Sequence, residues 1–138
     1  MRAYFYFLIF ILVGACSDPA PNDLLPDTPV DITINLNNPE FNSAQIPGGW
    51  ATISGGIKGI LLYNKNGTYV AFDRACPHLP PASCSAMTFD GLLLTCPCDD
   101  STFNIFNGGV SQTDGVNYSA REYHVQAVNS MSLRITNY

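Results

Sequence analysis

The chain has 138 residues, of which 46% are hydrophobic and 12% are charged, a balance that allows a packed core and excludes a globally disordered chain. This length suits one small domain and a leader. The formal net charge is −5 and no basic patch is present, so we expect no nucleic-acid partner.

The first 15 residues have the composition of a signal peptide. Arg2 precedes an apolar run over residues 3–15, which is too short to span a bilayer as a helix. The sequence Val-Gly-Ala-Cys ending at Cys16 resembles the lipobox of bacterial lipoproteins, in which the cysteine is lipidated and becomes the mature N-terminus. The alternative is an ordinary cleaved leader beside a chance cysteine. Lipidated Cys16 would hold the domain on a membrane of the bacterial cell envelope, facing the periplasm or the outer-membrane surface.

Residues 16–29 predict a semi-extended tether, because prolines and aspartates dominate this segment. From residue 30 the pattern changes to alternating apolar and polar residues, which predicts a half-buried strand over 30–36. Similar short segments separated by Gly- and Asn-rich turns predict the remaining strands, at 50–54, 58–63, 68–73, 92–95, 102–106, 123–128 and 131–136. Residues 64–67 read as a hairpin turn. We therefore expect one all-β domain over residues 30–138.

Four of the five cysteines and one of the two histidines lie in residues 76–103. Their order is Cys76-x-His78 and then Cys96-x-x-Asp99. This arrangement resembles a Rieske iron–sulfur domain, which uses Cys-x-His on one loop and Cys-x-x-His on a second. The Cys-Pro-Cys segment at residues 96–98, with the following serine and phenylalanine, resembles the second loop of that family.

The resemblance implies an antiparallel β-sandwich or barrel with a small subdomain that binds a [2Fe–2S] cluster through loops at about 74–84 and 94–103. In this family each loop sends its cysteine to one iron and its histidine to the other. By that rule Cys76 and Cys96 would hold one iron, while His78 and Asp99 would hold the other. Asp99 stands where the family has its second histidine. The other histidine, His124, alternates with apolar residues and is expected on the polar face of its strand.

Three interpretations of Asp99 remain open. In the first, Asp99 is a cluster ligand, which adds negative charge and gives a reduction potential below that of ordinary Rieske centres. In the second, the fold has lost its cluster, and Cys76 and Cys96 can also pair. In the third, a single Zn²⁺ is bound by Cys76, His78, Cys96 and Asp99.

The remaining two cysteines of the loops are also explained by the resemblance. Many Rieske domains carry a disulfide between the two loops, which implies a Cys84–Cys98 bridge here. An exported protein lies where disulfides persist. A Cys96–Cys98 bridge is a rival, although residues two apart in an extended loop match disulfide geometry poorly. Two unpaired thiols are the other alternative.

Two functions follow from these observations. The first is an envelope-anchored Rieske-type carrier that passes one electron at a time between a membrane-side donor and an unidentified redox partner protein. The alternative is a cluster-free structural or interaction module on a lipid tether. The sequence has no Ser-His-Asp arrangement, phosphate-binding Gly loop or mononuclear-iron domain, so we do not expect an enzyme.

Overall fold

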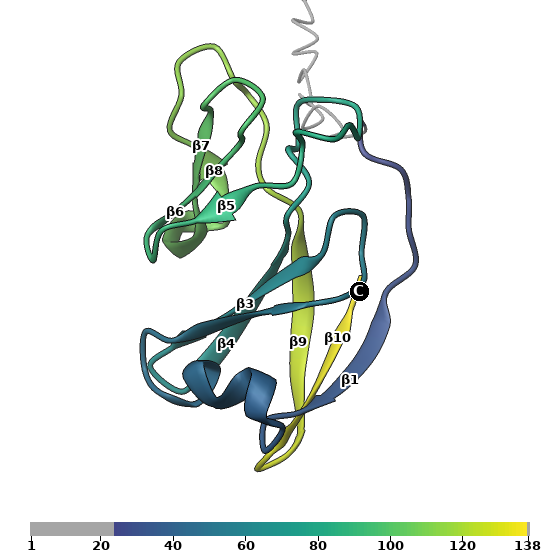
Figure 1. Ribbon diagram of the computed structural model, residues 1–138, viewed down its shortest axis with the longest axis vertical. Helices are drawn as coiled ribbons and strands as arrows, with labels where there is room; N and C mark the ends of the chain where they lie inside the picture. Colours follow the sequence, from purple (N-terminus) through teal and green to yellow (C-terminus); the bar gives the residue numbers. More distant parts are fainter. Residues whose placement is uncertain (1–23, 138) are drawn as a thin grey trace, which may run out of the picture.

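The computed structural model describes residues 24–137, and its elements form two antiparallel β-sheets (Figure 1). The larger sheet has six strands in the spatial order β1 (Asp31–Asn35), β10 (Ser132–Thr136), β9 (Glu122–Asn129), β4 (Thr68–Asp73), β3 (Ile60–Lys65) and β2 (Trp50–Ile53). The smaller sheet has the order β5 (Thr88–Phe89), β6 (Leu93–Thr95), β7 (Thr102–Asn104) and β8 (Val110–Ser111). Two short 3₁₀ helices complete the described chain, η1 (Pro39–Gln45) and η2 (Ile105–Asn107).

The all-β prediction is confirmed, and each predicted strand is present with its ends moved by up to two residues. Alternation of apolar and polar residues does not reveal two-residue strands or short 3₁₀ helices, so β5, β8 and both helices were not predicted. The 64–67 turn is tighter than predicted. Strand β3 continues to Lys65, and only Asn66 and Gly67 turn the chain, with φ of 54° and 92°. This pair suits a two-residue hairpin loop.

The described residues form two apolar cores, and the six-stranded sheet contributes to both. The first core lies in the six-stranded sheet and contains no cysteine among residues 24–137; its buried residues include Val30, Ile34, Leu36, Phe41, Ile53, Ile60, Leu62, Leu133 and Ile135. The second core lies between the two sheets and contains one candidate ligand from each loop, Cys76 and Cys96. Its large apolar side chains include Leu61, Phe72, Met87, Leu94, Phe103 and Ile105. The cysteine loops are therefore anchored in the second core.

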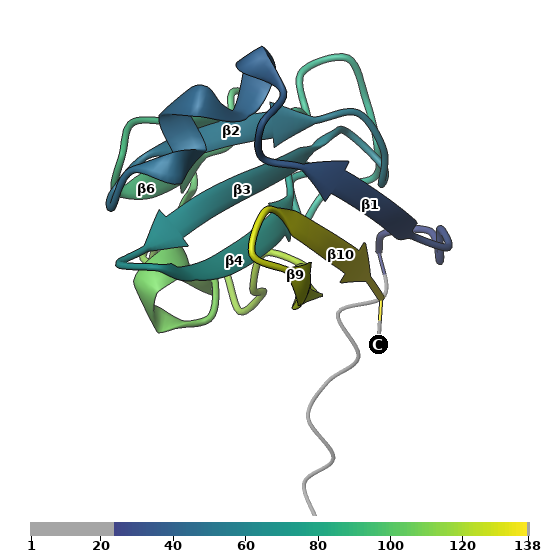
Figure 2. The same ribbon diagram turned by 90° about the horizontal axis from the view of Figure 1, so that it is seen from below.

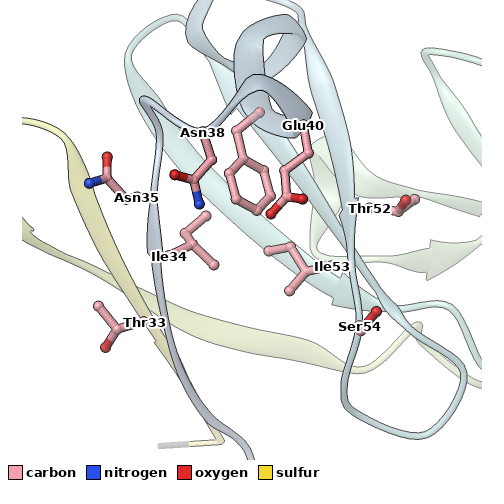
Figure 3. Close-up of a pocket in the computed structure, with 9 residues that line it drawn as sticks. Thr33, Ile34, Asn35, Asn38, Glu40, Thr52, Ile53 and Ser54 are labelled. Atoms are coloured by element: carbon pink, nitrogen blue, oxygen red, sulfur yellow. The ribbon is translucent and has the colours of Figure 1, made fainter.

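The six-stranded sheet curls so that its two edge strands, β1 and β2, approach each other (Figure 2). Gly55 has φ of 138°, a conformation that strains any residue with a side chain, and a Cβ there would lie 2.5 Å from Cδ1 of Ile32. Beside this seam, a cavity of about 390 Å³ is lined by β1, η1 and β2, with Ile34 and Ile53 facing each other across it (Figure 3). Helix η1 and the smaller sheet lie at opposite ends of the molecule (Figure 1), so this cavity is remote from the cysteine loops.

Residues 24–29, which the sequence assigns to the tether, contact the folded domain. Leu25 is buried, and the Arg121 guanidinium donates to the carbonyl oxygens of Leu25 and Pro26 at 3.2 and 2.7 Å. Asn137 Nδ2 donates to Thr28 O at 2.9 Å. The leader and Cys16 lie outside the described residues. Within residues 24–137, no helix has the length and apolar character needed to cross a membrane.

Candidate metal centre

Backbone hydrogen bonds hold both cysteine loops in place. The first loop connects β4 to β5, and its two arms pair through Cys76 N to Ser85 O at 2.8 Å and a bridge between Ala75 and Ala86. The second loop connects β6 to β7 as a tight turn. Its ends are joined by hydrogen bonds from Cys96 N to Ser101 O and from residue 100 N back to the carbonyl of Cys96, both 2.8 Å.

A buried carboxylate fixes the start of the first loop. Asp73 is fully buried and accepts hydrogen bonds from Ile57 N, Ala75 N and the Tyr123 hydroxyl at 2.7 Å each, and from Lys58 N at 3.2 Å. Four donors compensate the desolvation of the charge. Sequence reasoning missed this residue. The only signal was an aspartate at the end of an apolar strand, three positions before the first loop cysteine.

The loop cysteines form two disulfides. Cys84 pairs with Cys98, the bridge that the family resemblance implies, and Cys76 pairs with Cys96. The second pairing is the one considered for a cluster-free fold. Cys76 and Cys96 are fully buried, whereas Cys84 is exposed. A disulfide supplies no thiolate, so the structure represents the oxidised state of the two cysteine ligand candidates.

His78 and Asp99 lie directly against each other. His78 Nε2 is 2.6 Å from Asp99 Oδ2, and the side chain of His78 is 9% exposed compared with 37% for Asp99. When Nε2 carries the proton of this bond, Nδ1 of the neutral imidazole has a free lone pair. Nδ1 is buried and has no hydrogen-bond partner among residues 24–137. A buried imidazole nitrogen without a hydrogen-bond partner is uncommon, and such a nitrogen is suited to act as a metal ligand.

Asp99 is also held by its own loop. Ser101 donates to it twice, from N to Oδ1 at 3.1 Å and from Oγ to Oδ2 at 2.9 Å. The hydrogen bond from His78, followed by those from Ser101, keeps the pKa of Asp99 below its ordinary value, because each bond favours the carboxylate. The neighbouring Asp100 has φ of 62°, a conformation in which glycine is more stable.

The structure brings the four predicted site residues together. Ligand atoms of His78, Cys96 and Asp99 lie within 4.8 Å of one another, and Cys76 is bonded to Cys96. His124 lies on β9, is exposed, and pairs with Thr136 of β10. It takes no part in this site, as the alternation along its strand predicted.

The donor set suits iron when the Cys76–Cys96 pair is reduced. Two thiolates, an imidazole and a carboxylate would then converge on one small volume, and the unpartnered Nδ1 of His78 would gain a bond. The same cysteines cannot ligate as a disulfide. The fit therefore holds for the dithiol form, which requires the two-electron reduction of one buried bond.

Comparison with family models identifies the class of protein. The model described as the Rieske [2Fe-2S] domain matches residues 38–125. This chain belongs to the Rieske [2Fe-2S] domain family. A [2Fe–2S] cluster is the cofactor of that family, and Cys76, Cys96, His78 and Asp99 provide residues that can form its site.

One of the solved structures compared agrees on the fold, with a TM-score above 0.5. The complex of reduced oxygenase and oxidized ferredoxin in carbazole 1,9a-dioxygenase contains a chain that is 19% identical, with 78% of this chain and 94% of that chain covered and a TM-score of 0.52. The ferredoxin of carbazole 1,9a-dioxygenase from Nocardioides aromaticivorans is also 19% identical, with coverages of 78% and 96% and a TM-score of 0.49. The search of curated proteins returned no match.

Proposed function

We propose that this protein is a membrane-anchored Rieske-type electron carrier of the bacterial cell envelope. A bound [2Fe–2S] cluster would supply one-electron chemistry. Cys76 and Cys96, as thiolates, would hold one iron, and His78 and Asp99 the other. The lipid on Cys16 would keep the domain near a membrane, where it exchanges electrons with a redox partner protein.

The observation that carries the proposal is the buried, unpartnered Nδ1 of His78 beside Cys96 and Asp99. Asp99 orients the imidazole by accepting from Nε2, and it would exchange this hydrogen bond for iron when the cluster binds. Phe103 packs beside the ring with a centroid separation of 5.7 Å. This apolar contact limits the access of water to the His78 side of the site.

The test is iron analysis of the full chain after anaerobic reduction and reconstitution with iron and sulfide. We expect about two irons per chain, visible absorption and an electron paramagnetic resonance signal in the reduced state. Replacement of the carboxylate in Asp99→His should raise the reduction potential, because an anionic ligand is exchanged for a neutral one. Zinc alone would support the mononuclear interpretation, and a colourless, iron-free chain would reject electron carriage.

One observation favours a second candidate, a cluster-free structural or interaction module. Cys76 and Cys96 form a disulfide within an intact fold, and Asp99 is already satisfied by His78 and Ser101. Failure of both the wild-type protein and Asp99→His to take up iron after reduction would favour this module. Restored uptake only in Asp99→His would show that the carboxylate alone blocks the site.

The anchor requires a separate measurement. Its support is the apolar leader and the lipobox-like sequence at Cys16. We expect wild-type protein in the membrane fraction and the Cys16→Ser variant in the soluble fraction of an envelope-exporting bacterium. Equal membrane association of the two proteins would contradict lipidation at Cys16 without affecting the iron result.

A further inference from the structure

The two disulfides lie at different depths. Cys84, in the outer bridge, is exposed, and its partner Cys98 is half-buried against the second core. Cys76 and Cys96, in the inner bridge, have no exposed surface. A dissolved thiol can therefore reach Cys84 but has no direct access to the inner bridge in the folded state.

Cys98 links the two bridges. Its Sγ atom and those of Cys76 and Cys96 all lie within 4.8 Å of one another. Thiol–disulfide exchange proceeds when a thiolate attacks a disulfide sulfur and displaces the other sulfur. A thiol attacking exposed Cys84 would expel Cys98, which is the sulfur beside the inner bridge.

We propose that the Cys84–Cys98 disulfide is the site at which external dithiols react, and that Cys98 passes this reduction to the buried Cys76–Cys96 disulfide. The reacting partner is a dithiol, either a small molecule or a protein with two neighbouring cysteines. This thiol–disulfide exchange goes beyond electron carriage and requires no iron.

The exchange balances in four steps. One thiolate of the external dithiol attacks Cys84 Sγ, forms a mixed disulfide and releases Cys98 as a thiolate. The second external thiol displaces Cys84, and the external dithiol leaves as a disulfide. Cys98 then attacks Cys76 or Cys96 and releases the other one. Finally, Cys84 attacks Cys98, which restores the outer bridge and frees the second buried sulfur. In total, two electrons and two protons pass from the external dithiol to Cys76 and Cys96.

The product of the exchange is a protein whose inner cysteine pair is able to bind metal. After the exchange, Cys76 and Cys96 are thiols while the outer bridge still ties the loops together. The pair is then in the state that a metal requires, within a fold that remains cross-linked. Oxidation of the pair returns the protein to the state seen in the structure.

Two single variants test the proposal, and each of them removes the Cys84–Cys98 disulfide. Cys84→Ser keeps Cys98 as a free thiol beside the inner bridge, and Cys98→Ser keeps only the exposed Cys84 thiol. Metal-free full chain would be treated with dithiothreitol, quenched in acid to stop thiolate chemistry, and labelled with maleimide in denaturant. Peptic digestion and tandem mass spectrometry would then show which cysteines had been freed at each time.

We expect Cys76 and Cys96 to be freed at least about tenfold faster in Cys84→Ser than in Cys98→Ser, because an intramolecular thiol acts at a high effective concentration. Equal rates would overturn the proposal. The wild-type protein provides a measurement that does not depend on folding of the variants. Quenched samples should contain peptides in which Cys98 is linked to Cys76 or Cys96, and the absence of both links throughout reduction would also overturn it.

Discussion

Asp100 occupies a backbone conformation that costs free energy at the centre of the second loop. Its φ of 62° lies in the left-handed region, where residues that carry a Cβ atom are disfavoured relative to glycine. Asp100→Gly should therefore increase the free energy of unfolding by about 0.5–1 kcal/mol, measured by chemical denaturation. Asp114→Gly is the control, because Asp114 is exposed and is not left-handed. Asp114→Gly should slightly lower the free energy of unfolding. Equal effects of the two substitutions would contradict backbone strain at Asp100.

The environment of Tyr123 leads us to expect that the folded protein becomes less stable at alkaline pH. Burial, followed by the hydrogen bond to Asp73, raises the pKa of Tyr123 above its ordinary value of 10.0. The group stays protonated in the folded chain after the unfolded chain has begun to ionise. The contribution of Tyr123 to the free energy of unfolding is therefore complete below pH 10.0, and it declines as pH rises toward the pKa of the folded state.

The comparison of wild-type protein with Tyr123→Phe isolates this contribution. At neutral pH the variant should lose about 1–3 kcal/mol of unfolding free energy, because the buried Asp73 side chain loses one of its four hydrogen-bond donors. The difference in melting temperature between the two proteins should shrink as pH rises above about 10, since Phe cannot ionise. Tyr69, whose pKa burial also raises, is present in both proteins and cancels in the comparison. A difference that does not change with pH would contradict the assignment.

At the scale of elements, the turn between η2 and β8 packs the smaller sheet onto the larger one. Gly108 and Gly109 both have left-handed φ, of 64° and 73°. A Cβ on Gly108 would meet no atom within 4 Å, whereas one on Gly109 would lie 2.9 Å from Ala120 O and 3.0 Å from Phe72 Cε1. The two positions therefore share backbone strain and differ only in packing.

Alanine substitution separates these two effects. Gly108→Ala should cost about 1 kcal/mol of unfolding free energy through the backbone alone. Gly109→Ala should cost at least about 2 kcal/mol more, because the added methyl group displaces Phe72 or the backbone of residue 120. Denaturant midpoints of the two variants check the difference. Similar midpoints would indicate that the turn moves freely away from the second core.

At the scale of the whole molecule, the two cores should respond differently to reduction of both disulfides. The inner and outer bridges close loops with sequence separations of 20 and 14 residues, and each stabilises the fold by about 3 kcal/mol in the chain-entropy account. Both bridges belong to the second core and its loops, while the first core has no cysteine.

Hydrogen exchange in excess dithiothreitol tests this independence. We expect amide protection in β6 and β7 to fall at least about tenfold, while β3, β4 and β9 keep most of theirs. The same chain without reductant is the control. A uniform loss of protection across both sheets would show that the disulfides support the whole domain rather than one end of it.

Local patterns were sufficient to predict the long strands and the identity of the loop residues. Alternation at 30–36 and the Asn-Gly turn at 66–67 are determined by neighbours along the chain, and the spacing of Cys76-x-His78 and Cys96-x-x-Asp99 is a property of two short segments. The same reasoning could not detect β5 or β8, because two residues contain too little periodicity to distinguish a strand from a loop.

Contacts between distant segments were decided only by the tertiary structure. The bonds that bury Asp73, the pairing of Cys76 with Cys96 and the unpartnered Nδ1 of His78 each depend on residues brought together by folding. The sequence established that a Rieske-type loop pair exists and which side chains it carries. The fold decided which cysteines can pair and which hydrogen-bond partners the ligand candidates have, because these depend on distances between loops that lie 20 residues apart along the chain.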